Sequence, residues 1–295
     1  MRRARTTGVA LAAALLLSGC GYGMYSPVTE QGKDIHGLYN VLFAAAAIVF
    51  VLVEGAIVFA VFRYRRRGDM LPPQFHGNNL LEVAWTVVPF LIVAGLFVLT
   101  WGVLNRVDAR ADNPRVVLNV VGFQWQWQFT YQDEKVRVEP GKPPRDLTIK
   151  GTIAKPPEIY LPVGQTIQVN TEAEDVIHSF FIPEFLFKKD AFPAHTNTFD
   201  LTITKPGVYR GQCAEYCGLA HQAMRFTVHV VPMAEYRAWI ADAKKRAASG
   251  GPLFLGEVFP GPRTVTYDVK PLPKGSYFFR CDVHPTQMHG AFVVK

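Results

Sequence analysis

The pattern of hydrophobic and polar positions changes near residue 105. Before that point, residues 38–62 form an apolar run interrupted by Glu54, and residues 80–101 form a second apolar run. About 20 apolar residues are enough to cross a bilayer as a helix. The pattern therefore predicts a two-helix transmembrane hairpin over residues 38–104. Glu54 is expected to face a partner subunit, because carboxylates inside a span avoid lipid.

After residue 105, short β-branched and aromatic segments alternate with turns such as 162–164 and 206–207. Residues 123–129 alternate aromatic side chains with glutamine, which predicts a strand with one aromatic face. Strands are also predicted at 116–121, 146–149, 158–161, 166–170, 198–203 and 225–231. We expect an all-β antiparallel sandwich over residues 105–231. A short helix at 233–248 should follow, within a helix-and-linker segment spanning 232–251.

The N-terminus has the pattern of a secretory signal. Three arginines among the first five residues precede an apolar run at 9–17 that is too short to span a membrane. A cysteine directly after Ser-Gly is typical of a bacterial lipoprotein, so residues 1–19 are predicted to be removed and Cys20 to be lipidated. A single lipid anchor binds a membrane only weakly. The alternative is an unprocessed signal anchor with an incidental cysteine.

Four arginines within residues 63–67 lie between the two apolar runs. Positively charged loops stay in the cytoplasm, so residues 20–37 and the chain from residue 105 onward are predicted on the periplasmic or extracellular side. We expect a two-pass protein of the bacterial cell membrane.

Composition agrees with a membrane protein that also has a folded domain. Apolar residues make up 49% of the 295 residues and charged residues only 19%. The formal net charge of +7 could indicate a nucleic-acid partner. However, that charge is concentrated in the signal and in the arginine loop, so no nucleic-acid binding is expected.

One short segment gathers several metal-binding side chains. Cys213 and Cys217 are followed by His221 and Met224. Thiolate, imidazole and thioether ligands suit copper, whereas magnesium and calcium take oxygen ligands. A single copper needs one such thiolate, and two thiolates can bridge a pair of coppers that share one electron. His178 is the candidate for a further imidazole. The alternatives are a plain disulfide between the cysteines and a packed core histidine at 178.

Three segments, residues 175–180, 188–193 and 213–224, resemble subunit II of cytochrome c oxidase, the subunit that carries the dinuclear copper centre CuA. The resemblance covers residues 30 to about 245 and implies a Greek-key cupredoxin fold for the sandwich. In such a fold the ligand loop lies between the last two strands, and His178 comes from a separate loop. The implied ligands are His178, Cys213, the backbone carbonyl of Glu215, Cys217, His221 and Met224.

The resemblance also implies the partners and the reaction. A c-type cytochrome would deliver electrons to CuA, which would pass them to heme in subunit I. Subunit III would complete the complex. Heme, oxygen reduction and proton pumping would belong to the partner subunits.

Further roles follow from the resemblance. Trp125 corresponds to the residue where electrons enter, although Phe123 and Gln126 replace the family's usual histidine and tyrosine. Glu82 corresponds to the glutamate at the mouth of a proton channel, with a surface glutamate as the alternative. The Glu215 side chain corresponds to a magnesium ligand at the boundary with subunit I. Ala194 replaces a usual glycine, which is expected to alter a turn.

Charge does not favour a strongly basic donor. Residues 105–231 contain fourteen acidic and fourteen basic side chains. Docking of a basic cytochrome usually needs an acidic patch. A local patch near His178 could be formed by Glu172, Glu174, Asp175 and Glu184.

The tail, residues 252–295, carries a second signal. Cys281, His284 and Met288 have the ligand order found at the end of a blue-copper domain. Such a site needs a further histidine, and His289 is a strained candidate. About forty residues rarely fold alone, so the tail must dock on this domain, on another subunit or on a copy of itself. It is either a structural remnant or a copper site completed in trans.

Three rival functions remain. A CuA protein of the nitrous oxide reductase type shares the ligand spacing but needs a large additional domain. Subunit II of a quinol oxidase is a metal-free structural subunit of the same fold and lacks the ligands. A periplasmic copper-delivery protein would have one exposed Cys/Met site and no need of two spans.

Overall fold

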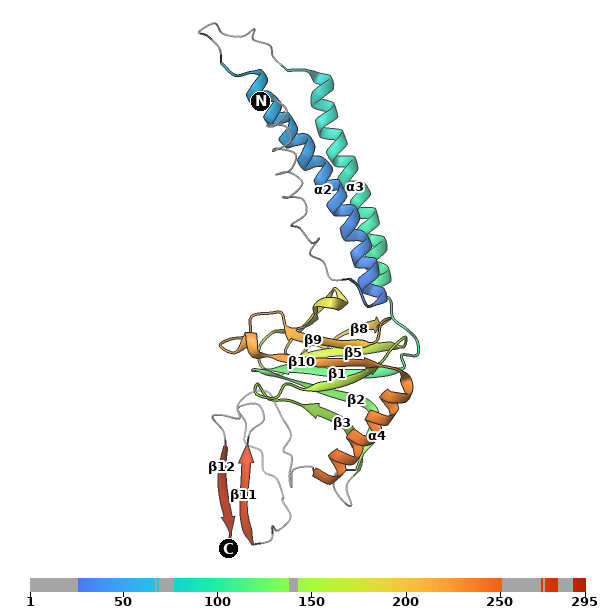
Figure 1. Cartoon of the computed structure of the whole chain (residues 1–295), viewed down its shortest axis with the longest axis vertical. Coiled ribbons are helices and arrows are strands. Elements are labelled where there is room, and N and C mark those ends of the chain that lie inside the picture. Colours follow the sequence, from blue (N-terminus) through green and yellow to red (C-terminus); the bar gives the residue numbers. More distant parts are fainter. Residues whose placement is uncertain are drawn as a thin grey trace, which may run out of the picture.

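The computed structural model describes residues 26–66, 68, 77–137, 143–250, 272, 274–280 and 289–295. Two long helices, α2 (Glu30–Arg63) and α3 (Asn79–Val107), lie side by side and project from a β-sandwich (Figure 1). Their exposed apolar side chains and their length suit a membrane. The predicted hairpin is present, and both helices extend beyond their apolar runs.

The extension of α2 has a local cause. The Thr29 side chain caps the helix by accepting a hydrogen bond from Gly32 N at 2.8 Å. A side-chain oxygen at this position satisfies a backbone N–H that the first turn leaves free. The helix therefore begins eight residues before the apolar run, in the polar segment next to the sandwich. Asn78 caps α3 in the same way, through Leu80 N and Leu81 N.

The sandwich consists of two five-stranded sheets. The first has the order β3-β2-β1-β5-β8 and the second the order β4-β10-β9-β6-β7. The pairs β1·β5 and β4·β10 are parallel and the other pairs are antiparallel. The strands of the first sheet are β1 (Val116–Phe123), β2 (Gln126–Val136), β3 (Arg145–Lys150), β5 (Thr166–Ala173) and β8 (Asn197–Thr202). Those of the second are β4 (Glu158–Pro162), β6 (His178–Ile182), β7 (Phe187–Ala191), β9 (Gly207–Cys213) and β10 (Arg225–Val231).

The core lies between the two sheets. Trp127, Phe129 and Tyr131 of β2 are fully buried and alternate with less buried neighbours. Phe226 of β10 packs against Trp127 and Phe129, with ring centroids 5.6 and 5.2 Å apart. Burial of such large apolar side chains is the main stabilising term of the sandwich.

Three sequence-based expectations about the sandwich are wrong. The strands are not all antiparallel, because β1 pairs with β5 and β4 pairs with β10 in parallel. Residues 123–129 do not form one strand, because a turn at Gln124–Trp125 separates β1 from β2. His178 does not come from a loop: it is the first residue of β6 and pairs with Ala191 of β7. The burial of four of the five β6 residues removes the alternation that would have marked the strand.

Short elements complete the fold. The helix α4 (Met233–Gly250) covers β2, β3 and β4, close to the predicted bounds. Two 3₁₀ turns, η1 (Pro183–Phe185) and η2 (His221–Ala223), shape the loops. In the tail, β11 (Gly275–Arg280) and β12 (His289–Val294) form a hairpin. The β-branched run at 264–269 favours a further tail strand, but it lies outside the described residues.

Ala194, at the position where the resemblance implies a glycine, lies in a turn after β7. Ala194 itself has a φ of 57°, in the left-handed region. An alanine there is strained by roughly 1–2 kcal/mol relative to ordinary backbone. The turn after β7 therefore carries a small cost in stability.

Candidate metal centre

Two cysteines form the centre of the site: Cys213 is the last residue of β9, and Cys217 lies in the loop that leads to β10. The side chains of Cys213 and Cys217 are buried, and their Sγ atoms are 3.8 Å apart. A disulfide needs about 2.05 Å, and both are free thiols. His178 Nδ1 lies 3.8 Å from Cys213 Sγ, and the three residues can offer ligand atoms within 4.8 Å of one another.

The remaining expected donors lie around the same two sulfurs. Cys217 Sγ is 3.5 Å from His221 Nδ1 and 3.9 Å from Met224 Sδ. The carbonyl oxygen of Glu215 is 3.2 Å from Cys213 Sγ. The turn η2 folds the loop back so that Cys213 N donates to Met224 O at 3.0 Å. All the donors predicted from the sequence are therefore adjacent to a cysteine sulfur.

Asp175 sets the orientation of His178. Its Oδ1 accepts a hydrogen bond from His178 Nε2 at 2.9 Å, while its Oδ2 accepts one from Gln124 N at 2.7 Å. A proton held on Nε2 leaves the Nδ1 lone pair directed at the sulfurs. Gly122 of β1 makes room for the ring, since a Cβ there would meet three His178 atoms at 3.0 Å.

Charge in the metal-free site is distributed unequally. Burial alone would lower the pKa of His178, but the Asp175 carboxylate and Cys213 raise it. Burial would raise the pKa of Cys213, yet His178 and the backbone hydrogen bonds to Glu215 and Ser179 together lower it to about 7. Burial and the neighbouring Cys213 charge raise the pKa of Cys217 to about 12. One thiolate is therefore favoured next to His178, and the second thiol keeps its proton.

Aromatic side chains close the site on its inner and outer sides. Trp127 is fully buried, donates from Nε1 to Met224 O at 3.4 Å and lies edge-on to His178 with ring centroids 6.1 Å apart. The half-buried Trp125 donates from Nε1 to Cys217 O at 3.0 Å, and Gln124 Nε2 donates to the same oxygen at 2.8 Å. The Trp125 ring is thus hydrogen-bonded to the backbone of the loop that carries the proposed ligands.

Other predicted site residues lie apart from the sulfurs. The Glu215 carboxylate points to Lys188 Nζ at 3.5 Å, and Lys188 also lies 3.5 Å from Asp190. Glu82 is exposed in the first turn of α3, and Glu54 is exposed on α2. Cys20, Cys281, His284 and Met288 lie outside the described residues.

Sequence reasoning missed the supporting residues. Asp175 is expected from the sequence only as part of a local acidic patch, and the structure shows that it is also the hydrogen-bond partner of His178. Its position three residues before His178 was the available signal. The contact of Gln124 with the carbonyl of Cys217 joins residues 93 positions apart, and no local pattern indicates it.

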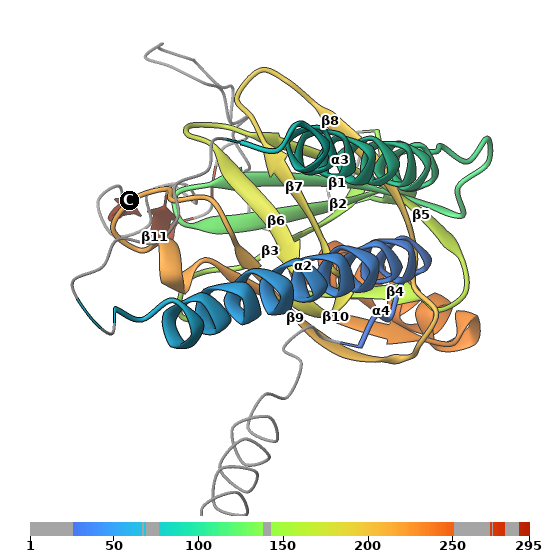
Figure 2. The same cartoon turned by 90° about the horizontal axis from the view of Figure 1, so that it is seen from above.

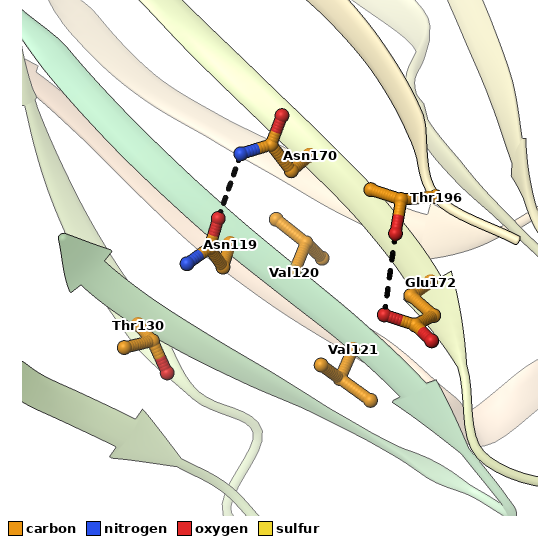
Figure 3. A pocket seen from close by; sticks show the side chains of 7 residues that line it. All are labelled: Asn119, Val120, Val121, Thr130, Asn170, Glu172 and Thr196. Carbon is orange, nitrogen blue, oxygen red and sulfur yellow. Dashed lines mark hydrogen bonds between the residues drawn. The ribbon is translucent and has the colours of Figure 1, made fainter. Parts of the chain in front are cut away.

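A separate polar hollow lies on the outer face of the first sheet (Figure 3). It has a volume of about 410 Å³ and includes none of the metal donors. Asn170 Nδ2 donates to Asn119 Oδ1 at 2.8 Å, and Thr196 Oγ1 donates to Glu172 Oε2 at 3.4 Å. Because these polar groups are paired with one another, the hollow is a hydrogen-bonded sheet face.

Comparisons with known proteins fit this arrangement. Residues 116–231 match the family "Cytochrome C oxidase subunit II, periplasmic domain", and residues 20–100 match the corresponding transmembrane domain. A probable cytochrome c oxidase subunit 2 of Streptomyces avermitilis is 34% identical, over 84% of this chain and 88% of the relative. Cytochrome c oxidase subunit 2 of Cereibacter sphaeroides is 30% identical, over 81% and 84%. The solved periplasmic domain of subunit II of cytochrome oxidase from Bradyrhizobium japonicum is 31% identical, covers 47% of this chain and all of that domain, and has a TM-score of 0.40.

Proposed function

Since this chain belongs to the family of cytochrome c oxidase subunit II, we propose that its two cysteines hold a dinuclear copper centre of the CuA type. It is a two-pass membrane protein with the β-sandwich outside, and it is the electron-transfer subunit of an oxidoreductase complex. The proposal goes further than family membership in naming the metal and its ligands. These are His178, Cys213, the carbonyl of Glu215, Cys217, His221 and Met224.

The donor set of the structure suits this group. Two thiols face each other without a disulfide, each with an imidazole Nδ1 within 3.8 Å, and a thioether and a carbonyl complete the set. Soft sulfur and imidazole ligands select copper. When bound, the copper pair supplies one-electron exchange between an outer donor and the heme of subunit I. The convergence of all these donors on two sulfurs is the observation that carries the proposal.

The protein's own residues prepare the site. Asp175 holds the His178 ring in the tautomer that leaves Nδ1 free, and Trp127 excludes water from the inner side. Rigid support of this kind keeps ligand positions unchanged when the charge of a metal changes. Trp125 is our candidate for the residue where electrons enter, since its ring is bonded to the carbonyl of a ligand cysteine.

The partners follow at two levels of detail. Family membership supports assembly with other oxidase subunits. We propose subunits I and III as the neighbours and a c-type cytochrome as the donor. Glu82, in the first turn of α3 at the cytoplasmic end of the hairpin, is proposed to collect protons for a channel in subunit I.

Magnesium binding at Glu215 has less direct support than copper binding. The ion prefers six oxygen ligands in octahedral geometry. In the described part of the chain, the Glu215 carboxylate is already opposed by Lys188. The described residues therefore do not make a magnesium site by themselves, and a site at Glu215 would need oxygen ligands from subunit I.

The rival functions are weaker. A metal-free quinol oxidase subunit would not need every donor in place, and the nitrous oxide reductase type would not explain the match to the transmembrane family. A copper-delivery protein would have an exposed site, whereas His178, Cys213, Cys217 and Met224 are buried. A copper pair bound between two thiolates predicts a seven-line electron paramagnetic resonance signal.

The test is a metal count and this spectrum on the purified oxidase. Cys217→Ser should abolish the mixed-valence signal while the heme content stays unchanged. Gln222→Ala, which changes an exposed side chain of the same loop outside the proposed ligand set, is the matched control. A wild-type oxidase without the seven-line signal would revive the metal-free subunit.

A further inference from the structure

Ser179 is a fully buried polar residue beside the metal site, between the proposed ligand His178 and Phe180 in β6. In the second sheet, β6 lies between β7 and β9, the strand that ends at Cys213 (Figure 2). A buried hydroxyl without a hydrogen-bond partner lowers stability. The Ser179 hydroxyl has a partner, because its Oγ donates to Asp190 Oδ1 of β7 at 2.7 Å. The side chain of Ser179 is therefore fixed to the neighbouring strand.

The backbone of Ser179 holds the cysteine on its other side. Ser179 O accepts a hydrogen bond from Ala214 N at 3.1 Å, directly after Cys213. A second backbone hydrogen bond joins Ser179 to the Cys213 thiol and lowers the pKa of that thiol. A hydrogen bond that lowers a thiol pKa stabilises the thiolate, so the Ser179 N–H is the donor and the sulfur is the acceptor. One residue thus contacts both the sulfur and the chain that follows it.

Asp190 is itself held in place. Its backbone carbonyl accepts hydrogen bonds from Asn197 Nδ2 at 2.8 Å and from Thr171 Oγ1 at 3.2 Å. Lys188 Nζ lies 3.5 Å from the Asp190 carboxylate and 3.5 Å from the Glu215 carboxylate. The Asp190 side chain is therefore a fixed point between the first sheet and the loop that carries the proposed ligands.

A hydrogen bond to the Cys213 sulfur has a consequence for electron transfer. At copper sites with a cysteine ligand, hydrogen bonding around the sulfur changes the reduction potential. An N–H donor draws negative charge away from the sulfur, which then stabilises the oxidised metal less. A well-placed N–H···S hydrogen bond therefore raises the potential, and the contacts that place it become part of the tuning.

Resting on the proposed function, we propose that Asp190 and Ser179 raise the reduction potential of the copper centre by holding the Ser179 N–H against the Cys213 sulfur. We call these two residues the clamp. Neither residue is a ligand, and both are positioning residues that act through Cys213. No bond forms or breaks and no proton moves, because the clamp changes only the free energy of one-electron reduction.

The first experiment compares the complete purified oxidase with its Ser179→Ala variant, which removes the hydroxyl without changing a charge or a ligand. A redox titration followed by the seven-line electron paramagnetic resonance signal measures the potential, alongside the copper content. Without the contact to Asp190 the N–H···S bond weakens, so we expect a lower potential and altered hyperfine splitting at unchanged copper content.

Thr130→Ala is the matched control. It also removes a strand hydroxyl that is paired with another side chain, since Thr130 Oγ1 and Thr148 Oγ1 are 3.1 Å apart. This pair lies on the outer face of the first sheet, away from the metal donors. The control should leave the potential and the hyperfine splitting unchanged, even if it costs some stability.

Two substitutions of Asp190 form a second test at equal charge. Asp190→Asn and Asp190→Ala both remove one negative charge near the metal, which raises the potential in both. Asparagine keeps an Oδ1 that accepts from the Ser179 hydroxyl, whereas alanine does not. We therefore expect the potential of Asp190→Ala to lie below that of Asp190→Asn. This comparison decides the question where Ser179→Ala does not assemble.

The outcomes are distinguishable. An equal potential in Ser179→Ala and the wild type, or in the two Asp190 variants, would overturn the clamp and leave Ser179 a structural role. A shift of the same size in Thr130→Ala would also overturn it. Loss of copper in both Ser179→Ala and Asp190→Ala would show that these residues retain the ligand instead of tuning it, which contradicts the proposal too. A wild-type oxidase without the seven-line signal would contradict the proposed function itself.

Discussion

At the scale of single residues, Asp175 supports the proposed ligand His178. Its two oxygens accept hydrogen bonds from three groups, His178 Nε2, Gln124 N and Val176 N. These bonds explain why the pKa of Asp175 is lowered although burial alone would raise it. A carboxylate that stays ionised keeps the imidazole in one tautomer and raises its basicity as a ligand.

Asp175→Ala should therefore weaken copper binding without removing a ligand. Loss of a hydrogen-bond partner behind a ligating histidine typically costs 10–100-fold in metal affinity. Competition of the purified oxidase with a copper chelator measures the change. Asp112→Ala, an exposed carboxylate outside the site, should leave affinity unchanged. Equal copper retention in the two variants would contradict the positioning role of Asp175.

The unequal thiols predict proton release during copper loading. Ligating thiols must be deprotonated, and the pKa of Cys217 in the metal-free site is raised to about 12 by burial and by Cys213. Loading near pH 8 should release the Cys217 proton. Below the Cys213 pKa of about 7, the Cys213 proton must also leave when copper binds. The apparent copper affinity should therefore rise with pH, and it should rise more steeply below pH 7 than above it. Calorimetry of the copper-depleted oxidase in buffers of different ionisation enthalpy measures this release, and a buffer-independent heat would contradict it.

At the scale of elements, the segment before α2 joins the hairpin to the sandwich. Thr204 N donates to Val28 O at 2.7 Å, and Thr29 Oγ1 donates to Phe185 O at 3.0 Å. Thr29 also forms an isolated bridge with Ile203. On the exit side, Asp200 Oδ2 accepts from Ala111 N at 2.6 Å. The sandwich is thus attached on both sides, which orients the metal site relative to the membrane.

Gly32→Ala should disturb this junction. A Cβ at residue 32 would lie 2.5 Å from Phe185 O and 2.7 Å from Thr29 Oγ1. Relief requires a shift of α2 against η1, and such overpacking costs about 1–3 kcal/mol. We expect a lower thermal midpoint of the purified oxidase. Gly37→Ala is the matched control on the same helix, because a Cβ there meets nothing within 4 Å. It should be neutral or stabilise slightly, by up to about 1 kcal/mol, and an equal loss in both variants would argue against the clash.

At the scale of the whole molecule, local patterns predicted the parts whose chemistry is local. Long apolar runs indicated the helices, and the spacing of Cys213 and Cys217 indicated the metal site. The strand β6 was missed because both of its faces are buried, so it shows no period of two. The role of Asp175 and the bond from Trp125 to the ligand loop depend on tertiary contacts, which no linear pattern contains.

The sequence alone gives two alternatives for the tail, a structural remnant or a second copper site. Its described strands β11 and β12 pair only with each other, and an isolated two-stranded hairpin is marginally stable. A blue-copper site at Cys281, His284 and Met288 would also need another histidine.

We expect the oxidase with the full chain and one whose chain ends at Ser249 to contain equal copper, with the same visible spectrum. The Cys281→Ser full chain is the matched control for loss of the thiol without loss of the tail. The opposite outcome is a third copper and an intense blue band in the full-chain oxidase that both altered oxidases lack. It would establish the tail as a second redox site, completed by a histidine from a neighbouring surface.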